Sequence, residues 1–260
     1  VMSLFRQFFR ANLKGLLIWL AVGVLLMLSG TRSAVTFIDN NSLEALPQSL
    51  MNLYGNLADM NPVDQYLTIA VGKLTLLIPA LYTVILALSI VTREVDRRTA
   101  EFLLALPVQR TQVLLARIAV MAVNVTVVVA GIWAVLRFDL AAQGYQGSWG
   151  HLDLLFVNVL LLSFAIGVVT LAASMWVDDY SVGVKLFLGL VTLVYLLETI
   201  MRAAGVSRVW RLASPFSYVD IAGVMRTGSI AAGNVIVLVV AIATGLAVSF
   251  WAFNRKQFPA

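Results

Sequence analysis

Six apolar stretches, separated by polar segments, dominate the pattern of hydrophobic positions along the chain. Most are at least as long as the roughly 20 residues that an α-helix needs to cross the hydrocarbon core of a bilayer. The first is shorter, and we expect it to borrow residues from its flanks and to be retained as a span. The sequence therefore predicts an all-α polytopic membrane protein with six transmembrane helices, at residues 15–30, 67–91, 113–136, 152–177, 182–201 and 234–253.

Composition agrees with this class. Of the 260 residues, 61% are hydrophobic and 12% are charged, whereas soluble domains are about 45–50% apolar and about 25% charged. The chain has no cysteine, which excludes disulfides, thiolate metal sites and cysteine catalysis.

The segment before the first span, residues 3–14, is amphipathic. Three phenylalanines share one helical face, while Arg6, Arg10 and Lys14 recur every four residues on an adjacent face. This pattern predicts an N-terminal amphipathic helix lying in the membrane interface. A plain positively charged flank that orients the first span explains the pattern equally well, and both interpretations place this end in the cytoplasm.

The distribution of cations sets the topology. Ten of the eighteen Lys and Arg residues fall in predicted cytoplasmic segments and six fall in external ones, which agrees with the positive-inside rule. The external segments are 31–66, 137–151 and 202–233, and four of the six external arginines crowd into the last. Residues 178–181 form a tight cytoplasmic turn, in which an Asp or a Ser can cap the next helix.

Residues 92–112 are the most highly charged stretch of the chain. Four arginines alternate there with three acidic residues, and desolvating so many charges in hydrocarbon costs more than packing can offset. The stretch is therefore predicted to be a cytoplasmic hairpin tip between spans two and three. It also carries an apolar stripe that ends at a proline, made up of Phe102, Leu103, Leu104, Leu106 and Pro107.

Several chemistries are missing from the sequence. Gly72-Lys73 is followed by Leu74 inside a span, so the phosphate-binding loop G-x-x-x-x-G-K-[ST] is not formed. The single histidine, His151, excludes H-E-x-x-H and any multi-histidine metal site. Asp178-Asp179 is interpreted as a helix-capping turn. We expect no catalytic residue, no metal site and no bound cofactor in this chain, which is not an enzyme by itself.

The charged hairpin resembles a known signature. Residues 93–110, REVDRRTAEFLLALPVQR, are similar to the segment that follows the second span in type-2 ATP-binding-cassette (ABC) exporter permeases. That family often has Gly directly before the Thr, where this chain has Arg98. The positions that match the family pattern are Glu94, Thr99, Glu101, Leu103, Leu104, Pro107 and Arg110.

The resemblance extends to the interfacial helix, the six spans and a motif in the last external loop, formed by Ser214, Pro215, Phe216, Ser217 and Tyr218 with Asp220. It implies that residues 92–112 form a cytoplasmic coupling helix held in a groove of a separate ATPase subunit. The apolar side chains would anchor it, and the arginines would set its register. The implied interface consists of Arg93, Glu94, Arg97, Arg98, Thr99, Glu101, Phe102, Leu103, Leu104, Leu106, Pro107 and Arg110.

The same resemblance implies the partners and the activity. They are a cytoplasmic ATPase subunit that binds ATP and Mg, a second permease copy in a homodimer or heterodimer, and the lipid bilayer, with no nucleic acid. The complex would export an amphipathic or hydrophobic compound, such as an antibiotic, peptide or lipid-like molecule, across a bacterial plasma membrane. An ion-gradient-driven secondary transporter and a membrane anchor that recruits a cytoplasmic protein are the alternatives.

Two charged residues, Lys73 and Glu198, fall inside predicted spans near their outer ends, so they are candidates to pair with each other; the alternative is that the Lys73 amine extends to the membrane surface. Such a pair is more often structural than part of a substrate path. Asn124, Thr192 and Tyr195 either line a pathway or join helices. The last external loop, residues 202–233, is either re-entrant, as the resemblance implies, or an aromatic belt at the membrane surface.

Overall fold

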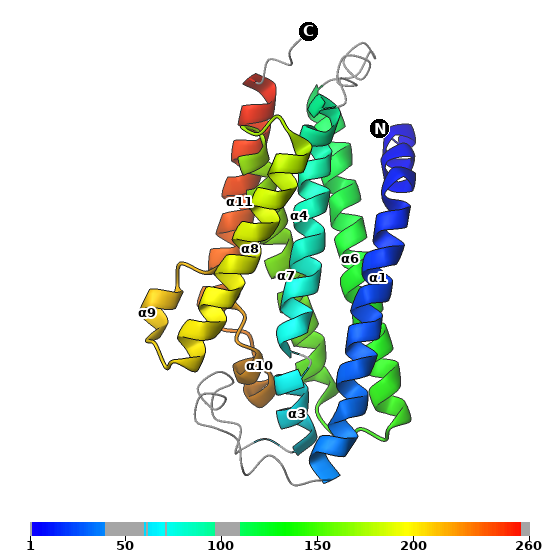
Figure 1. Ribbon diagram of the computed structural model, residues 1–260, viewed down its shortest axis with the longest axis vertical. Helices are drawn as coiled ribbons and strands as arrows, with labels where there is room; N and C mark the ends of the chain where they lie inside the picture. Colours follow the sequence, from blue (N-terminus) through cyan, green and yellow to red (C-terminus); the bar gives the residue numbers. More distant parts are fainter. Residues whose placement is uncertain (1, 40–59, 61, 71, 97–109, 256–260) are drawn as a thin grey trace.

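The computed structural model describes residues 2–39, 60, 62–70, 72–96 and 110–255, and within them every regular element is a helix (Figure 1). Five helices are long and apolar enough to cross a membrane, and a sixth, α4, has a shorter apolar core at Thr75–Ile90. The all-α polytopic membrane fold is thus confirmed. The long helices are α1 (Met2–Asp39), α4 (Gly72–Asp96), α6 (Arg110–Ala142), α7 (Trp149–Ser174), α8 (Tyr180–Ala203) and α11 (Ala232–Arg255), and the short ones are α3 (Pro62–Ala70), α9 (Arg208–Arg211), the 3-10 helix η2 (Pro215–Tyr218) and α10 (Ile221–Thr227).

Helix α7 is the centre of the bundle. In its most apolar stretch 67% of the residues are buried, against 11% in α8 and 17% in α1. It packs against α4, α6 and α11, and it also contacts α10 and η2. The outward faces of α1, α8 and α11 stay apolar because lipid, and not water, surrounds a membrane span.

Small residues let α7 approach its two main neighbours closely. Gly167 of α7 faces the side chain of Thr83 on α4, where a Cβ atom would collide with the threonine methyl group. Gly245 of α11 faces α7, and a Cβ atom there would lie 3.3 Å from the backbone carbonyl carbon of Val168. Close backbone approach at small residues is a main source of attraction between helices in membranes.

Helix boundaries differ from the predicted spans in two places near the start of the chain. Residues 3–14 and 15–30 lie in one continuous helix, α1, so the predicted interfacial helix is not a separate element. The predicted span 67–91 is divided between α3, which ends at Ala70, and α4, which begins at Gly72.

The predicted external loop 137–151 is mostly helical. Helix α6 continues to Ala142, since Arg137 is neutralised there by Asp153 of α7, with N–O distances of 2.7 and 3.0 Å. The Arg137 guanidinium also lies over the rings of Trp133 and Trp149, at 5.2 and 4.9 Å from their centres. The ion pair and the two aromatic contacts hold charged residues in helix beyond the apolar run.

At its other end α7 stops at Ser174, three residues before the predicted boundary. The predicted capping of the next helix is confirmed, because the Asp179 carboxylate accepts a hydrogen bond of 2.8 Å from the Val182 amide. This bond satisfies one of the amide groups that the first turn of α8 leaves without a helical partner.

The helices place two sets of segments at opposite ends of the bundle. The start of α1, the end of α4, the start of α6, the α7–α8 turn and the end of α11 lie at one end (Figure 1). We call this the hairpin end, because the predicted coupling segment is inserted there. The short helices α3, α9 and α10 lie at the other end, which we call the loop end.

Polar contacts tie the loop end together. The Tyr145 hydroxyl donates a short hydrogen bond to the carboxylate of Asp64 on α3, and the Tyr145 ring meets Trp149 edge-on at 4.9 Å. Burial, and then the neighbouring Asp64, raises the pKa of the Tyr145 phenol, so it stays protonated and keeps donating at physiological pH. Helix α10 is held by the Nδ1–H group of His151, which donates to the Met225 carbonyl at 2.7 Å.

The close α4–α7 contact predicts a sharp difference between two glycines. We expect Gly167→Ala to lower the stability by about 1–3 kcal/mol, because the added methyl group overpacks the contact with Thr83. Gly189→Ala on α8 is the matched control, since no atom lies within 4 Å of a Cβ there. Thermal unfolding of the purified proteins in detergent measures both, and equal melting temperatures would contradict the packing assigned to Gly167.

Candidate functional site

The predicted ATPase interface lies where α4 and α6 meet at the hairpin end. Arg93 and Glu94 belong to the last turns of α4, and Arg110 is the first residue of α6. Arg97, Arg98, Thr99, Glu101, Phe102, Leu103, Leu104, Leu106 and Pro107 lie outside the described residues. The coupling helix itself therefore stays a prediction, and the structure describes the two helices that carry it.

Beneath this segment a buried arginine joins three helices. Arg117 of α6 is only 7% exposed, and its Nη1 group donates a hydrogen bond to the backbone carbonyl of Ile90 on α4. The guanidinium also stacks over the ring of Phe8 on α1, with 4.3 Å between its central carbon and the ring centre. Phe8 packs in turn on Val113 and Ala116 of α6. We call this set of contacts the Arg117 clamp.

The clamp fixes the geometry of the hairpin base. Ile90 lies six residues before the end of α4, and Arg117 lies seven residues after the start of α6. A charged hydrogen bond in a region shielded from water is stronger than its exposed counterpart. The base of the hairpin is thus joined to α1, α4 and α6 through a single side chain.

From the sequence, Arg117 was identified only as one of the ten predicted cytoplasmic cations. The missed signal was its position on the buried face of α6, together with Val113, Val120 and Asn124 at helical spacing. An arginine on the inward face, two turns into an apolar helix, must find a partner inside the protein.

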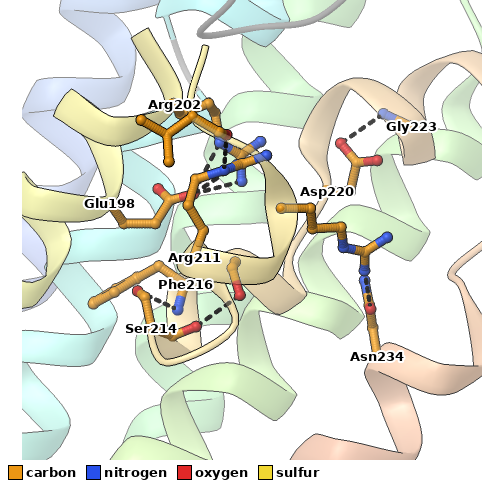
Figure 2. A network of polar contacts seen from close by, with 11 residues as sticks. Glu198, Arg202, Arg211, Ser214, Phe216, Asp220, Gly223 and Asn234 are labelled. Atoms are coloured by element: carbon orange, nitrogen blue, oxygen red, sulfur yellow. Dashed lines mark hydrogen bonds and ion pairs between the residues drawn. The ribbon is translucent and has the colours of Figure 1, made fainter. Parts of the chain in front are cut away.

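A second polar cluster lies at the loop end of α8 (Figure 2). Glu198 is 1% exposed, and its Oε1 atom accepts from Nε of Arg202 at 2.9 Å and from Nη1 of Arg211 at 3.4 Å. Arg211 also donates from Nε to the Val206 carbonyl at 3.1 Å. Glu198 therefore joins the end of α8 to α9.

The expected partner of Glu198 was Lys73, whose side chain lies outside the described residues. That pairing stays a prediction. The two arginines are the finding that the sequence did not supply. Arg202 follows Glu198 by one helical turn, a spacing that favours an ion pair, whereas Arg211 reaches it only through the fold of the loop.

The motif formed by residues 214–218 and Asp220 has a local structural role. Ser214 begins η2 by accepting from the Phe216 amide at 3.3 Å, and Tyr218 donates back to the Leu212 carbonyl at 2.8 Å. Phe216 is buried against Tyr195 of α8, with 5.2 Å between ring centres. Pro215 is the first residue of η2, and Asp220 caps α10 through the Gly223 amide at 3.2 Å.

The loop of residues 202–233 contains three short helices, α9, η2 and α10. Phe216, Ile221 and Val224 are buried, and η2 and α10 pack on α7. Whether they dip into the outer leaflet is a question of membrane position and stays a prediction.

The polar residues proposed for a pathway are not gathered at one place. Asn124 accepts from the Tyr82 hydroxyl at 3.2 Å and donates to the Val120 carbonyl, so it joins α4 and α6. Tyr195 contacts η2, and Thr192 lies one turn before it on α8. Asn124 therefore has the helix-joining role that the sequence left open beside the pathway role.

One buried amide was not singled out from the sequence. Asn158 of α7 is 1% exposed, and within the described part of the chain neither its oxygen nor its nitrogen has a hydrogen-bond partner. An unpaired amide at this depth is costly.

An apolar groove runs along the bundle between α8 and α11, with α7 as its floor and η2 at its loop end. Its volume is about 410 Å³, within the usual range of about 300–1,000 Å³ for small-molecule sites. The polar side chains on its walls are Thr170 and Tyr218. The groove is lined by Ala165, Ile166, Val169, Thr170, Ala173, Phe187, Leu190, Val191, Val194, Ala213, Pro215, Phe216, Tyr218, Val237, Leu238 and Ala241.

The Arg117 clamp predicts unequal effects for two arginines of α6. We expect Arg117→Met to lower the stability by about 1.5–3 kcal/mol, the range for a buried hydrogen bond to a charged group. Arg137→Met is the control, because the Arg137 side chain is 40% exposed and exposed ion pairs contribute at most about 1 kcal/mol. Thermal unfolding in detergent compares them, and a larger loss for Arg137→Met would contradict the clamp.

Comparison with known proteins identifies the family. The family model described as "ABC-2 family transporter protein" matches residues 14–198, which extend from α1 to Glu198 on α8. No curated protein matches the chain. The matched region is well over half of the chain and contains both helices that border the predicted coupling segment. The chain therefore belongs to the ABC-2 family of transporters, as a multi-pass membrane permease whose family membership implies association with an ATP-binding-cassette ATPase.

Proposed function

We propose that this chain is the membrane-spanning subunit of an ABC exporter, which couples ATP hydrolysis by a separate cytoplasmic ATPase to the export of an amphipathic or hydrophobic compound. The observation that carries this proposal is the Arg117 clamp. It holds the two helices of the hairpin, α4 and α6, against each other and against α1, directly beneath the segment that resembles a coupling helix.

The proposed coupling helix has the chemistry of a docking element. Leu103, Leu104 and Leu106 supply apolar side chains that a groove on the ATPase would desolvate. The flanking arginines fix orientation through complementary charge. The ATPase subunit binds ATP and Mg, since this chain lacks a phosphate-binding loop.

The packing of α4 gives the coupling helix a route into the bundle. Helix α4 contacts α7 along much of its length and also contacts α8. A movement of the ATPase that displaces the hairpin would therefore move α4 and α6 together as a rigid unit and shift them relative to α7. Rigid-body movement of packed helices about an interface is a common basis for switching between two states.

The cargo is proposed to be amphipathic or hydrophobic, such as an antibiotic, a peptide or a lipid-like molecule. The groove between α8 and α11 is almost wholly apolar, which suits such a compound better than a small ion. A second permease copy would complete the complex, and the apolar outward faces of α1, α8 and α11 offer surface for it.

Membership of the ABC-2 family disfavours an ion-gradient-driven transporter. A membrane anchor that recruits the ATPase through the same hairpin but transports nothing is the remaining alternative. The two differ in whether ATP hydrolysis responds to the state of the bundle.

The coupling proposal predicts loss of partnership when the hairpin is changed. We expect a variant with Leu103, Leu104 and Arg110 replaced by Ala to lose its ATPase partner or to lose coupled hydrolysis, because both anchoring and orienting groups are removed. The measurement is ATPase activity of the chain co-expressed and purified with an ATPase encoded beside it.

The control carries the same number of Ala substitutions, at Val239, Val240 and Arg226, which are exposed and far from the hairpin end. It is expected to bind the ATPase and hydrolyse ATP as the unchanged protein does. If the hairpin variant also behaves as the unchanged protein, residues 92–112 serve only as a topology signal and the coupling proposal is wrong.

The proposed orientation places the hairpin end in the cytoplasm. Because the chain has no cysteine, single cysteines report topology without background. We expect a membrane-impermeant maleimide to label Gln146→Cys and Ser229→Cys in intact cells. Gln112→Cys and Asp178→Cys should react only after permeabilisation, and the reverse pattern would invert the topology.

A further inference from the structure

The groove between α8 and α11 has almost wholly apolar walls and a volume of about 410 Å³. Small side chains, among them Ala165, Ala173 and Ala241, lie between the larger ones. Apolar walls of this kind suit a hydrocarbon chain.

The groove leads to the Glu198 cluster. Val194 and Phe216 line its loop end, and Glu198 lies one helical turn beyond Val194 on the same side of α8. Figure 2 shows Glu198, Arg202 and Arg211 beside Phe216 and Ser214. A molecule with its apolar part in the groove therefore has its polar end at these arginines.

The described part of this cluster carries excess positive charge. Arg202 and Arg211 both pair with the same oxygen of Glu198, at 2.7 and 3.4 Å. The contacts with Glu198 and Val206 use two nitrogens of each guanidinium, which has five N–H donors in all. Each side chain keeps 16% of its surface exposed, so both remain accessible to an anionic group.

From the shape and the charge we infer that the groove binds an anionic phospholipid, with one acyl chain between α8 and α11 and the phosphate at Arg202 and Arg211. Guanidinium groups match phosphate oxygens in geometry and bind them through charge-assisted hydrogen bonds. The proposed phosphate contacts, Arg202 and Arg211, lie at the loop end, so the proposal does not depend on coupling to an ATPase.

The test is native mass spectrometry of the full-length chain in detergent, titrated with phosphatidylglycerol or phosphatidylcholine of identical acyl chains. We expect phosphatidylglycerol to bind about tenfold more tightly, as one charge-assisted contact would give. Arg211→Gln should reduce this preference, because it weakens binding of the anionic phosphatidylglycerol more than binding of the zwitterionic phosphatidylcholine. Arg226→Gln, an exposed arginine of the same loop region, is the matched control and should keep the preference.

A second pair of variants tests the groove itself without altering charge. Ala241→Leu places three further carbons in the groove and should weaken binding of both lipids several-fold, whereas Ala243→Leu, on an exposed side of the same helix, should not. Thermal unfolding checks that each variant is folded. If Arg211→Gln does not fold, the Ala241→Leu and Ala243→Leu pair still tests whether a lipid chain lies in the groove.

Equal binding of the two lipids by the unchanged chain would overturn the inference that the groove binds an anionic phospholipid in preference to a zwitterionic one. Unchanged lipid binding by Ala241→Leu would overturn the acyl-chain site. If Ala241→Leu instead alters only the oligomeric state, the groove is a contact between copies of this chain and the inference is wrong.

Discussion

The requirement that no backbone polar group be left unbonded in hydrocarbon governs this fold. With no water to satisfy amides and carbonyls, spanning segments must be helical. Helices in lipid gain little from burying apolar surface, so their association depends on close packing and on polar contacts. Both are visible here, as Gly167 and Gly245 bring α4 and α11 onto α7, and Asn124 and Tyr82 join α4 to α6.

Polar contacts at the two ends of the bundle do different things. At the hairpin end Arg117 ties helices that are distant in sequence but adjacent in space. At the loop end Glu198 organises residues close to it along the chain. These contacts also account for the high number of arginines in residues 202–233. Arg202 and Arg211 are neutralised in part by Glu198, and Arg208 donates a hydrogen bond to Asn234 at 2.6 Å.

The all-α fold with its apolar helices could be predicted because it depends on local hydropathy. The helix ends could not, because they depend on tertiary contacts. Helix α6 passes Leu136 owing to the pairing of Arg137 with Asp153, which is remote in sequence. The partners of Arg117 and Arg211 could not be predicted for the same reason. Each arginine donates to a backbone carbonyl, of Ile90 and Val206 respectively, and a sequence pattern does not identify such an acceptor. The coupling segment, in contrast, was predicted from its charge and its resemblance, and residues 97–109 of it lie outside the described residues.

The contact between Arg117 and Ile90 is chemically one-sided. The arginine contributes a side chain, and the isoleucine contributes only its main-chain oxygen. Any residue that maintains the helix at position 90 can therefore accept the bond, while no other side chain combines the reach, charge and planar face that position 117 uses. Pairwise comparison of amino-acid identities at the two positions would carry no record of their interaction. A connection of this kind is detectable in a structure and invisible to methods that look for correlated substitutions.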